Sequence, residues 1–118
     1  MQIPWAVDSM ALVAAQAALA DQAYLREVVS RIRADCGAFG AALDRVEGID
    51  RCHSDANFFL LDLNDASAAD VAGRLASESM VVRQREDMPH HIRVTSMLPE
   101  ENIAVVGAIR RAMAESAG

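Results

Sequence analysis

Residues 91–102 read HIRVTSMLPEEN, and this stretch predicts both kinds of element that make up the fold, a strand followed directly by a helix. Ile92 and Val94 alternate with polar residues, which is typical of a β-strand with one buried face. Pro99 suits the first position of a helix, and the two glutamates after it suit the positive end of the helix dipole. The segment therefore predicts a strand over residues 91–96 and a helix that begins at Pro99.

The rest of the chain repeats these two patterns. Capping residues and apolar spacings of three and four predict three earlier helices, over about residues 9–20, 21–46 and 68–78. Shorter apolar runs between turn-forming residues predict three more strands, over residues 49–53, 57–63 and 80–84. Residues 85–90 are expected to form a polar loop. The order α-α-β-β-α-β-β-α predicts an α+β two-layer sandwich, with a small, mostly antiparallel four-stranded sheet and helices on one face.

The same spacings predict which side chains are buried. The helix over residues 21–46 is expected to turn one apolar stripe to the core: Tyr24, Leu25, Val28, Val29, Ile32, Cys36, Phe39, Leu43 and Val46. In the last helix the expected amphipathic face is formed by Ile103, Val106, Ile109, Arg110 and Met113. In the second strand, Phe58 and Leu60 are expected on one side, with Asn57, Phe59 and Leu61 on the other.

Composition excludes several classes of function. A chain of 118 residues has room for one core, and a formal net charge of −6 without clustered cations argues against nucleic-acid binding. No apolar run reaches the ~20 residues of a membrane span, and no secretory signal is visible. We therefore expect a cytoplasmic protein. Cys36 and Cys52 have no framework spacing, so both are expected to be buried and reduced.

All 11 basic residues are arginines, and the chain contains no lysine. Every mechanism that needs an ε-amine, including a Schiff base to pyridoxal phosphate (PLP), is therefore excluded for this polypeptide.

Three local clusters resemble reactive sites, and each has a simpler interpretation. His90 and His91 lie near Asp87, but neighbouring histidines point apart and no further ligand follows at metal spacing, so a solvated loop is favoured. Cys52 and His53 are neighbours in a predicted strand and would also face opposite ways. The acidic pair after Pro99 is a helix start. The sequence therefore predicts no metal site and no catalytic residue.

Arg93 is the one candidate binding residue. It lies on a predicted strand and projects from the face opposite Ile92 and Val94. A planar guanidinium on a rigid strand suits bidentate recognition of a carboxylate or phosphate. A solvent-facing arginine without function is the alternative, and the residue pattern alone favours that alternative.

Four segments, in series, resemble the C-terminal part of fold-type I aminotransferases of the histidinol-phosphate aminotransferase group: IPWAVDSMALVAAQAAL at residues 3–19, SDANFFLLDL at 54–63, MVVRQ at 80–84 and HIRVTSMLPEEN at 91–102. Pro4 and Trp5 also resemble the threonine-phosphate decarboxylase branch of that group. Residues 96–98 (SML) depart from the "VGT" of the group's pattern.

The resemblance implies the C-terminal small domain of a PLP-dependent enzyme, with residues 1–20 as a lead-in segment and interdomain helix and residues 21–118 as the domain itself. Arg93 matches the arginine that anchors the α-carboxylate or phosphate of the substrate, an amino acid or phosphorylated amino acid. Arg83 matches a second arginine of the group, whose role we leave open. PLP and its lysine would be supplied by a large domain, in the same or a separate chain, so this chain is expected to be inactive alone. Transamination and decarboxylation both remain open.

The alternative hypothesis is a free-standing α+β binding or dimerisation module without catalytic activity. The helix over residues 9–20 is apolar on nearly every side, and such helices are normally buried on more than one face. Homo-oligomerisation through residues 3–20, or disorder of that segment, is therefore expected if nothing else covers it.

Overall fold

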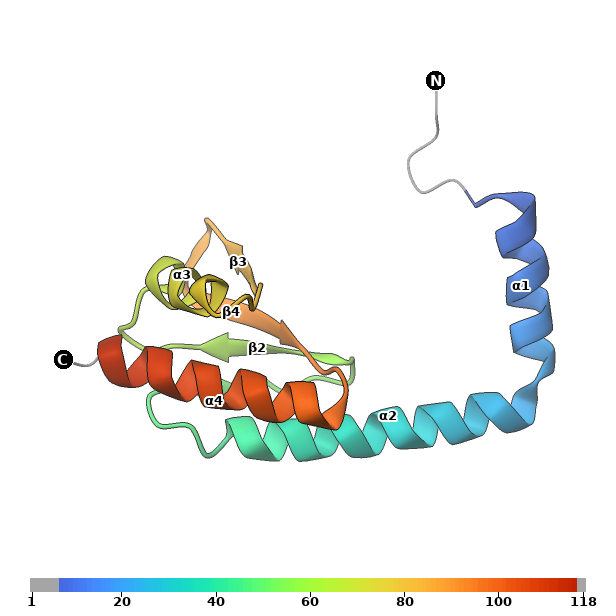
Figure 1. Ribbon diagram of the computed structural model, residues 1–118, viewed down its shortest axis with the longest axis horizontal. Coiled ribbons are helices and arrows are strands. Elements are labelled where there is room, and N and C mark those ends of the chain that lie inside the picture. Colours follow the sequence, from blue (N-terminus) through green and yellow to red (C-terminus); the bar gives the residue numbers. More distant parts are fainter. Residues whose placement is uncertain (1–6, 117–118) are drawn as a thin grey trace, which may run out of the picture. The chain divides into compact units, whose positions relative to one another are not determined.

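A computed structural model describes residues 7–116 of the chain. The elements within that range are α1 (Ser9–Ala20), α2 (Gln22–Leu43), β1 (Asp50–Arg51), β2 (Phe58–Asp62), α3 (Ala68–Ser77), β3 (Arg83–Arg85), β4 (Met88–Thr95) and α4 (Pro99–Ser116). Their order is the predicted one, and the α+β class is confirmed (Figure 1).

The chain divides into two compact units, one up to Ile32 and one from Arg33 onward, so that the boundary falls within α2. In the first unit, Asp8 caps α1 by accepting a hydrogen bond from the Ala11 amide at 2.8 Å. Helix α1 has no charged side chain and no buried residue. No helix among residues 7–116 is both long enough and apolar enough to cross a bilayer. Pro4 and Trp5 lie outside the described residues.

In the second unit, all four strands are antiparallel in the order β1-β2-β4-β3. Phe59 is paired with Val94, and Leu61 with Ile92, so these four side chains share one face of the sheet. All four are buried, as the alternation predicted. They form one hydrophobic cluster with side chains from the end of α2 and from α3 and α4, including Phe39, Leu43, Val71, Leu75, Val106 and Ile109. Helices α3 and α4 and the end of α2 therefore cover this face of the sheet (Figure 1).

The third strand and the loop after it differ from the prediction. The amide of Met80 donates to the carbonyl of Leu75 at 2.9 Å, and Ser79 has a φ of 63°, so residues 79 and 80 close α3 instead of beginning a strand. Strand β3 begins only at Arg83, and β4 already begins at Met88. The predicted polar loop is therefore mostly a β-hairpin.

Three burial predictions were wrong. In α2 only Phe39, Gly40 and Leu43 are buried, because most of the predicted stripe lies before the unit that holds the core. In α4, Ile103 is 74% exposed and Arg110 is exposed too, although both were placed on the face toward the core; Ile103 borders a hollow of about 160 Å³ between the start of α4 and the end of α2. Cys52 is exposed and Cys36 half-buried; both are free thiols.

Two glycines of α2 allow a matched test of the helix–sheet contact. A methyl group on Gly40 would lie 3.3 Å from the Arg51 guanidinium carbon and from the Phe59 ring, whereas one on Gly37 would meet nothing within 4 Å. Gly37→Ala is expected to stabilise the chain by about 0.5–1 kcal/mol, because glycine is a poor helix former. Gly40→Ala should lack this gain and be less stable than Gly37→Ala by about 1 kcal/mol or more, because it overpacks the contact. Urea unfolding of both variants measures the difference; equal effects would contradict the close approach.

Candidate functional site

The candidate site is centred on the sheet face opposite α3, α4 and the end of α2, which we call the open face, and it extends to the start of α4. Leu60 of β2 is paired with Arg93 of β4, and Arg93 with Arg83 of β3, so these three side chains occupy one row across the sheet. Asp62 and His91 are paired in the same way and lie in the next row. Strand alternation therefore places Arg93 on the face opposite Ile92 and Val94, as predicted.

Arg93 is half-buried, and its guanidinium carbon lies 4.8 Å from the centroid of the Phe58 ring. Its Nε atom is buried and has no hydrogen-bond partner among the described residues. No carboxylate among residues 7–116 lies within ion-pair distance of Arg93, which excludes described partners such as Asp62 or Glu100. The guanidinium is therefore held by an aromatic ring but lacks an anionic partner within this part of the chain.

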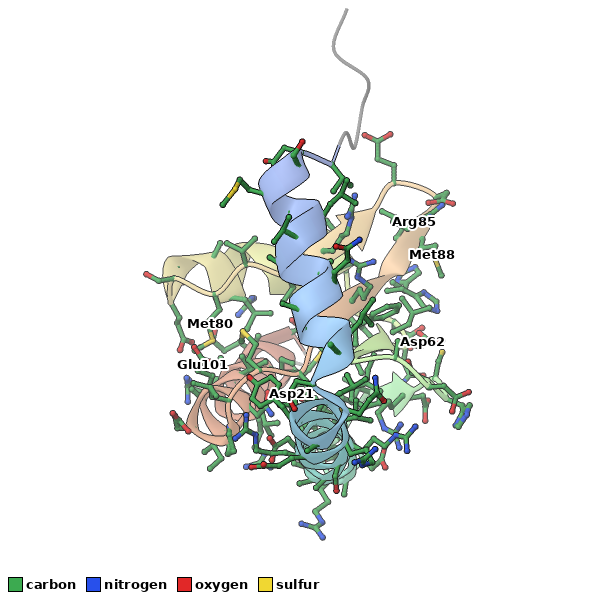
Figure 2. The ribbon with its side chains drawn as sticks, turned by 90° about the vertical axis from the view of Figure 1, so that its right-hand side faces the viewer. Asp21, Asp62, Met80, Arg85, Met88 and Glu101 are labelled. Carbon is green, nitrogen blue, oxygen red and sulfur yellow. The ribbon has the colours of Figure 1, made fainter. Side chains whose placement is uncertain are left out.

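Two grooves meet at Arg93. The hairpin groove, of about 640 Å³, is lined by residues of β2, β3 and β4 that include Phe58, Arg85 and Met88. The helix groove, of about 750 Å³, lies between residues 79–83, the end of β4 and the start of α4, and includes Met80 and Glu101. Figure 2 shows Arg85 beside Met88 at the end of the hairpin, and Met80 near Glu101 at the other groove. Arg83 and Arg93 line both grooves.

The charges of the site are unbalanced. Arg85 is bound through two hydrogen bonds, of 2.7 and 2.8 Å, to Asp87, which raise the pKa of Arg85 and lower that of Asp87. Arg83 and Arg93, directly opposite each other, have no such partner among the described residues. Like charges opposite each other on neighbouring strands are destabilising. An anion between Arg83 and Arg93 would offset that repulsion, so the arrangement is suited to binding a carboxylate or phosphate.

The turn that links β4 to α4 is held from within the chain. Asn102 is only 5% exposed, and its side chain accepts from the Met97 amide at 2.8 Å and donates to the Met97 carbonyl at 3.1 Å. Glu101 accepts from the Leu98 amide at 3.0 Å, as expected of a residue in a helix start. Glu101 is thus part of a helix cap and Glu100 lies in the same first turn, and the residues that replace "VGT" form a hydrogen-bonded connection between β4 and α4.

In the other two clusters that resembled reactive sites, the described hydrogen bonds and ion pairs of the histidines join them to residues outside the cluster. His90 and His91 lie in β4, not in a loop: His90 Nδ1 is 2.9 Å from the Ala66 carbonyl oxygen, and His91 Nε2 is 3.7 Å from Asp62. His53 is exposed and lies 3.4 Å from Asp55. Within residues 7–116 no group of three histidine, cysteine or acidic side chains is arranged to hold a metal ion.

The residues of the grooves do not fit PLP. An arginine pair can bind the phosphate of a ligand, but the Schiff base of this cofactor needs a lysine, and the chain has none. What the site can do chemically is bind and orient an anionic group.

Comparisons with known proteins agree with the fold and with the sequence resemblance. No protein-family model matches the chain. Histidinol-phosphate aminotransferase 1 of Cupriavidus pinatubonensis is 35% identical over 114 residues, which cover 93% of this chain and 30% of that protein. The crystal structure of histidinol-phosphate aminotransferase from Clostridium acetobutylicum has a TM-score of 0.84 at 23% identity, covering 97% of this chain and 36% of that one. That of L-threonine-O-3-phosphate decarboxylase from Porphyromonas gingivalis has a TM-score of 0.74 at 26% identity, covering 92% and 35%.

The chain thus spans only about 30% of the length of the curated relatives that it matches. The resemblance stated from the four sequence segments is confirmed: the chain is similar to a C-terminal part of this group of enzymes.

Proposed function

We propose that the chain is the substrate-anchoring small domain of a PLP-dependent enzyme of the histidinol-phosphate aminotransferase and threonine-phosphate decarboxylase group, acting in the cytoplasm. Arg93 binds the acidic end of the substrate, a carboxylate or a phosphate. The observation that carries the proposal is the guanidinium of Arg93, which lies at the meeting point of two grooves without a carboxylate partner among the described residues. Arg83 lies opposite it, also without a carboxylate partner among residues 7–116, and this supports the binding of an anion at this place.

The division of work follows from the composition of the chain. PLP stabilises negative charge on the carbon atom at which an amino acid reacts. The lysine that holds PLP belongs to a large domain, in the same or a separate chain, because this chain has no lysine. The role of the small domain is to bind and orient the anionic end of the substrate and to cover the site of reaction.

A chimeric enzyme tests this proposal. This chain replaces the matching 30% of the Cupriavidus pinatubonensis protein, whose own PLP-binding part is kept. We expect the chimera to bind PLP and to transaminate histidinol phosphate or another phosphorylated or acidic amino acid. The isolated chain, with its N-terminal amine blocked, should form no reducible imine with PLP, because it has no lysine. A chimera that binds PLP but uses no such substrate, or an imine in the isolated chain, would contradict the proposal.

The opposing candidate, a free-standing binding or dimerisation module, is favoured by one observation. Helix α1 has no charged residue and, within its own unit, no buried one. Large apolar surfaces are normally covered, so the isolated chain is expected to self-associate through residues 3–20. Light scattering over a range of concentrations measures this, and an intact chain that stays monomeric at high concentration would contradict it. If deletion of residues 3–20 restores a monomer without loss of the chimera's PLP binding, the association belongs to the uncovered helix alone.

A further inference from the structure

The aromatic contact of Arg93 comes from a diagonal neighbour on the next strand. Leu60 is directly opposite Arg93, and Phe58, two residues earlier on β2, is opposite Thr95. Diagonal neighbours of this kind are within reach of aromatic and long side chains. The Phe58 ring, 37% exposed, lies on the open face with the Arg93 guanidinium carbon 4.8 Å from its centroid. The stacked pair therefore joins β2 and β4 at the point where the hairpin groove reaches Arg93.

The nitrogens of Arg93 are not equivalent in this position. Nε is buried and has no hydrogen-bond partner among the described residues. Neither Nη atom is both buried and without a partner. A solvated arginine would turn its Nε–H toward water, because an unpaired buried donor is costly. The contact with the Phe58 ring is the described interaction that keeps the guanidinium in a position where its Nε–H does not reach water. The two Nη groups are then left for a ligand.

The chain contains a related contact between an arginine and an aromatic ring on the other side of the sheet. The guanidinium carbon of Arg51 lies 4.9 Å from the centroid of the Phe59 ring. Arg51 also donates hydrogen bonds from Nε (2.7 Å) and from one Nη (2.8 Å) to the two carboxylate oxygens of Asp44. Its bidentate contact thus uses Nε, the atom that at Arg93 is buried and without a partner among the described residues. Arg93 has the aromatic contact but, among the described residues, no carboxylate. The comparison indicates that an aromatic ring can hold an arginine for bidentate contact, and that at Arg93 the anion comes from outside this part of the chain.

We infer that Phe58 is a positioning residue, whose ring orients the Arg93 guanidinium so that its two Nη groups present a bidentate fork to an anionic ligand. The inference rests on the proposed function of Arg93 and assigns to Phe58 an effect on anion binding that acts through Arg93. A ring stacked against a guanidinium restricts its rotation, so less conformational freedom is lost when the ligand binds.

The 118-residue chain itself serves for the experiment, with inorganic phosphate as the probe. The Nε–Hε signal of Arg93 is assigned by nuclear magnetic resonance from its disappearance in Arg93→Lys. In the wild type we expect this signal to be displaced by the ring current of Phe58 and to exchange slowly with water. In Phe58→Leu both features should be lost, and the Kd for phosphate should rise about fivefold, which corresponds to the usual strength of an exposed cation–π contact. Phe58→Tyr keeps the ring and should bind within about twofold of the wild type.

Two controls separate positioning from folding. Ile103→Ala changes an exposed apolar side chain, 74% exposed, that lines neither groove, and it should alter neither the Arg93 signal nor the phosphate affinity. Urea unfolding of each variant shows whether Phe58→Leu remains folded under the conditions of the titration. Phe58→Trp provides a second aromatic replacement if the leucine variant is unfolded, and it should retain both the displaced signal and the affinity.

The outcomes are distinguishable. If Phe58→Leu leaves the Arg93 signal and its exchange unchanged, or binds phosphate as tightly as the wild type, the inference about Phe58 is wrong. If the wild type binds no phosphate while the signal changes as expected in Phe58→Leu, Phe58 orients Arg93 but the anion-binding role of Arg93 fails in this chain.

Discussion

Replacing Arg93 by alanine in the chimeric enzyme is expected to lower kcat/KM for an anionic substrate by about 30-fold to several thousand-fold. This range corresponds to the loss of about 2–5 kcal/mol when one member of a desolvated charge pair is removed. Under the proposed function the pair is desolvated in the chimera, because the large domain would then cover the open face. Arg93→Lys should not restore activity, since an ammonium group cannot reproduce the planar two-point contact of the guanidinium.

The same substitution should scarcely affect the isolated chain. Arg93 has no ion-pair partner among the described residues, so its removal leaves no buried carboxylate behind. The lost contact with Phe58 is worth about 0.5–1 kcal/mol at an exposed position. Kinetics of the chimera and urea unfolding of the isolated chain measure the two effects. Arg93→Ala that unfolds the chain, or that leaves kcat/KM unchanged, would make the role of Arg93 structural or incidental.

Ile92→Ala, one residue earlier on β4, is expected to have the opposite profile. Ile92 is 0% exposed and belongs to the hydrophobic cluster beneath the helices. Truncation of a fully buried isoleucine costs about 2–5 kcal/mol, because the transfer energy is lost and a cavity remains. This is a large part of the stability of a small domain. Chemical denaturation should therefore place the unfolding midpoint of Ile92→Ala far below that of the wild type.

The matched control for this prediction is Val81→Ala. Val81 is 93% exposed, so shortening it should change the free energy of unfolding by no more than about 0.5 kcal/mol. If Ile92→Ala and Val81→Ala were equally stable, the face assigned to Ile92, and with it the face assigned to Arg93, would be wrong.

Local sequence patterns predicted the start of a helix correctly where a single capping hydrogen bond fixes that start. Asp8 and Ser67 each accept a hydrogen bond from a backbone amide at a helix start, and these two helices begin at residues 9 and 68, as the sequence predicted. The third strand was predicted too early in the chain because residues 80–82 form an apolar run, which is typical of a strand. In the structure Met80 and Val82 pack against the core but precede β3, in irregular backbone. The closing hydrogen bond from Met80 back to Leu75 uses the amide that a strand would have needed.

Burial was harder to predict than secondary structure. The stripe of α2 has a regular spacing over its whole length, but spacing indicates only which residues share a face. Whether a core lies opposite that face depends on elements that follow much later in the chain. Tyr24 and Ile32 are therefore exposed, while Phe39 and Leu43 on the same helix are buried.

The sequence by itself determined the element order, the face of β4 on which Arg93 lies, and the exclusion of Schiff-base chemistry by the absence of lysine. These depend on single residues or on neighbours along the chain. Only the tertiary structure decided that Arg83 lies opposite Arg93, that Phe58 stacks on its guanidinium, and that Nε has no partner among the described residues. The physical reason is that the first depends on the register between β3 and β4 and the second on the register between β2 and β4. Strand register joins residues far apart in the sequence and is set by which face of each strand is buried.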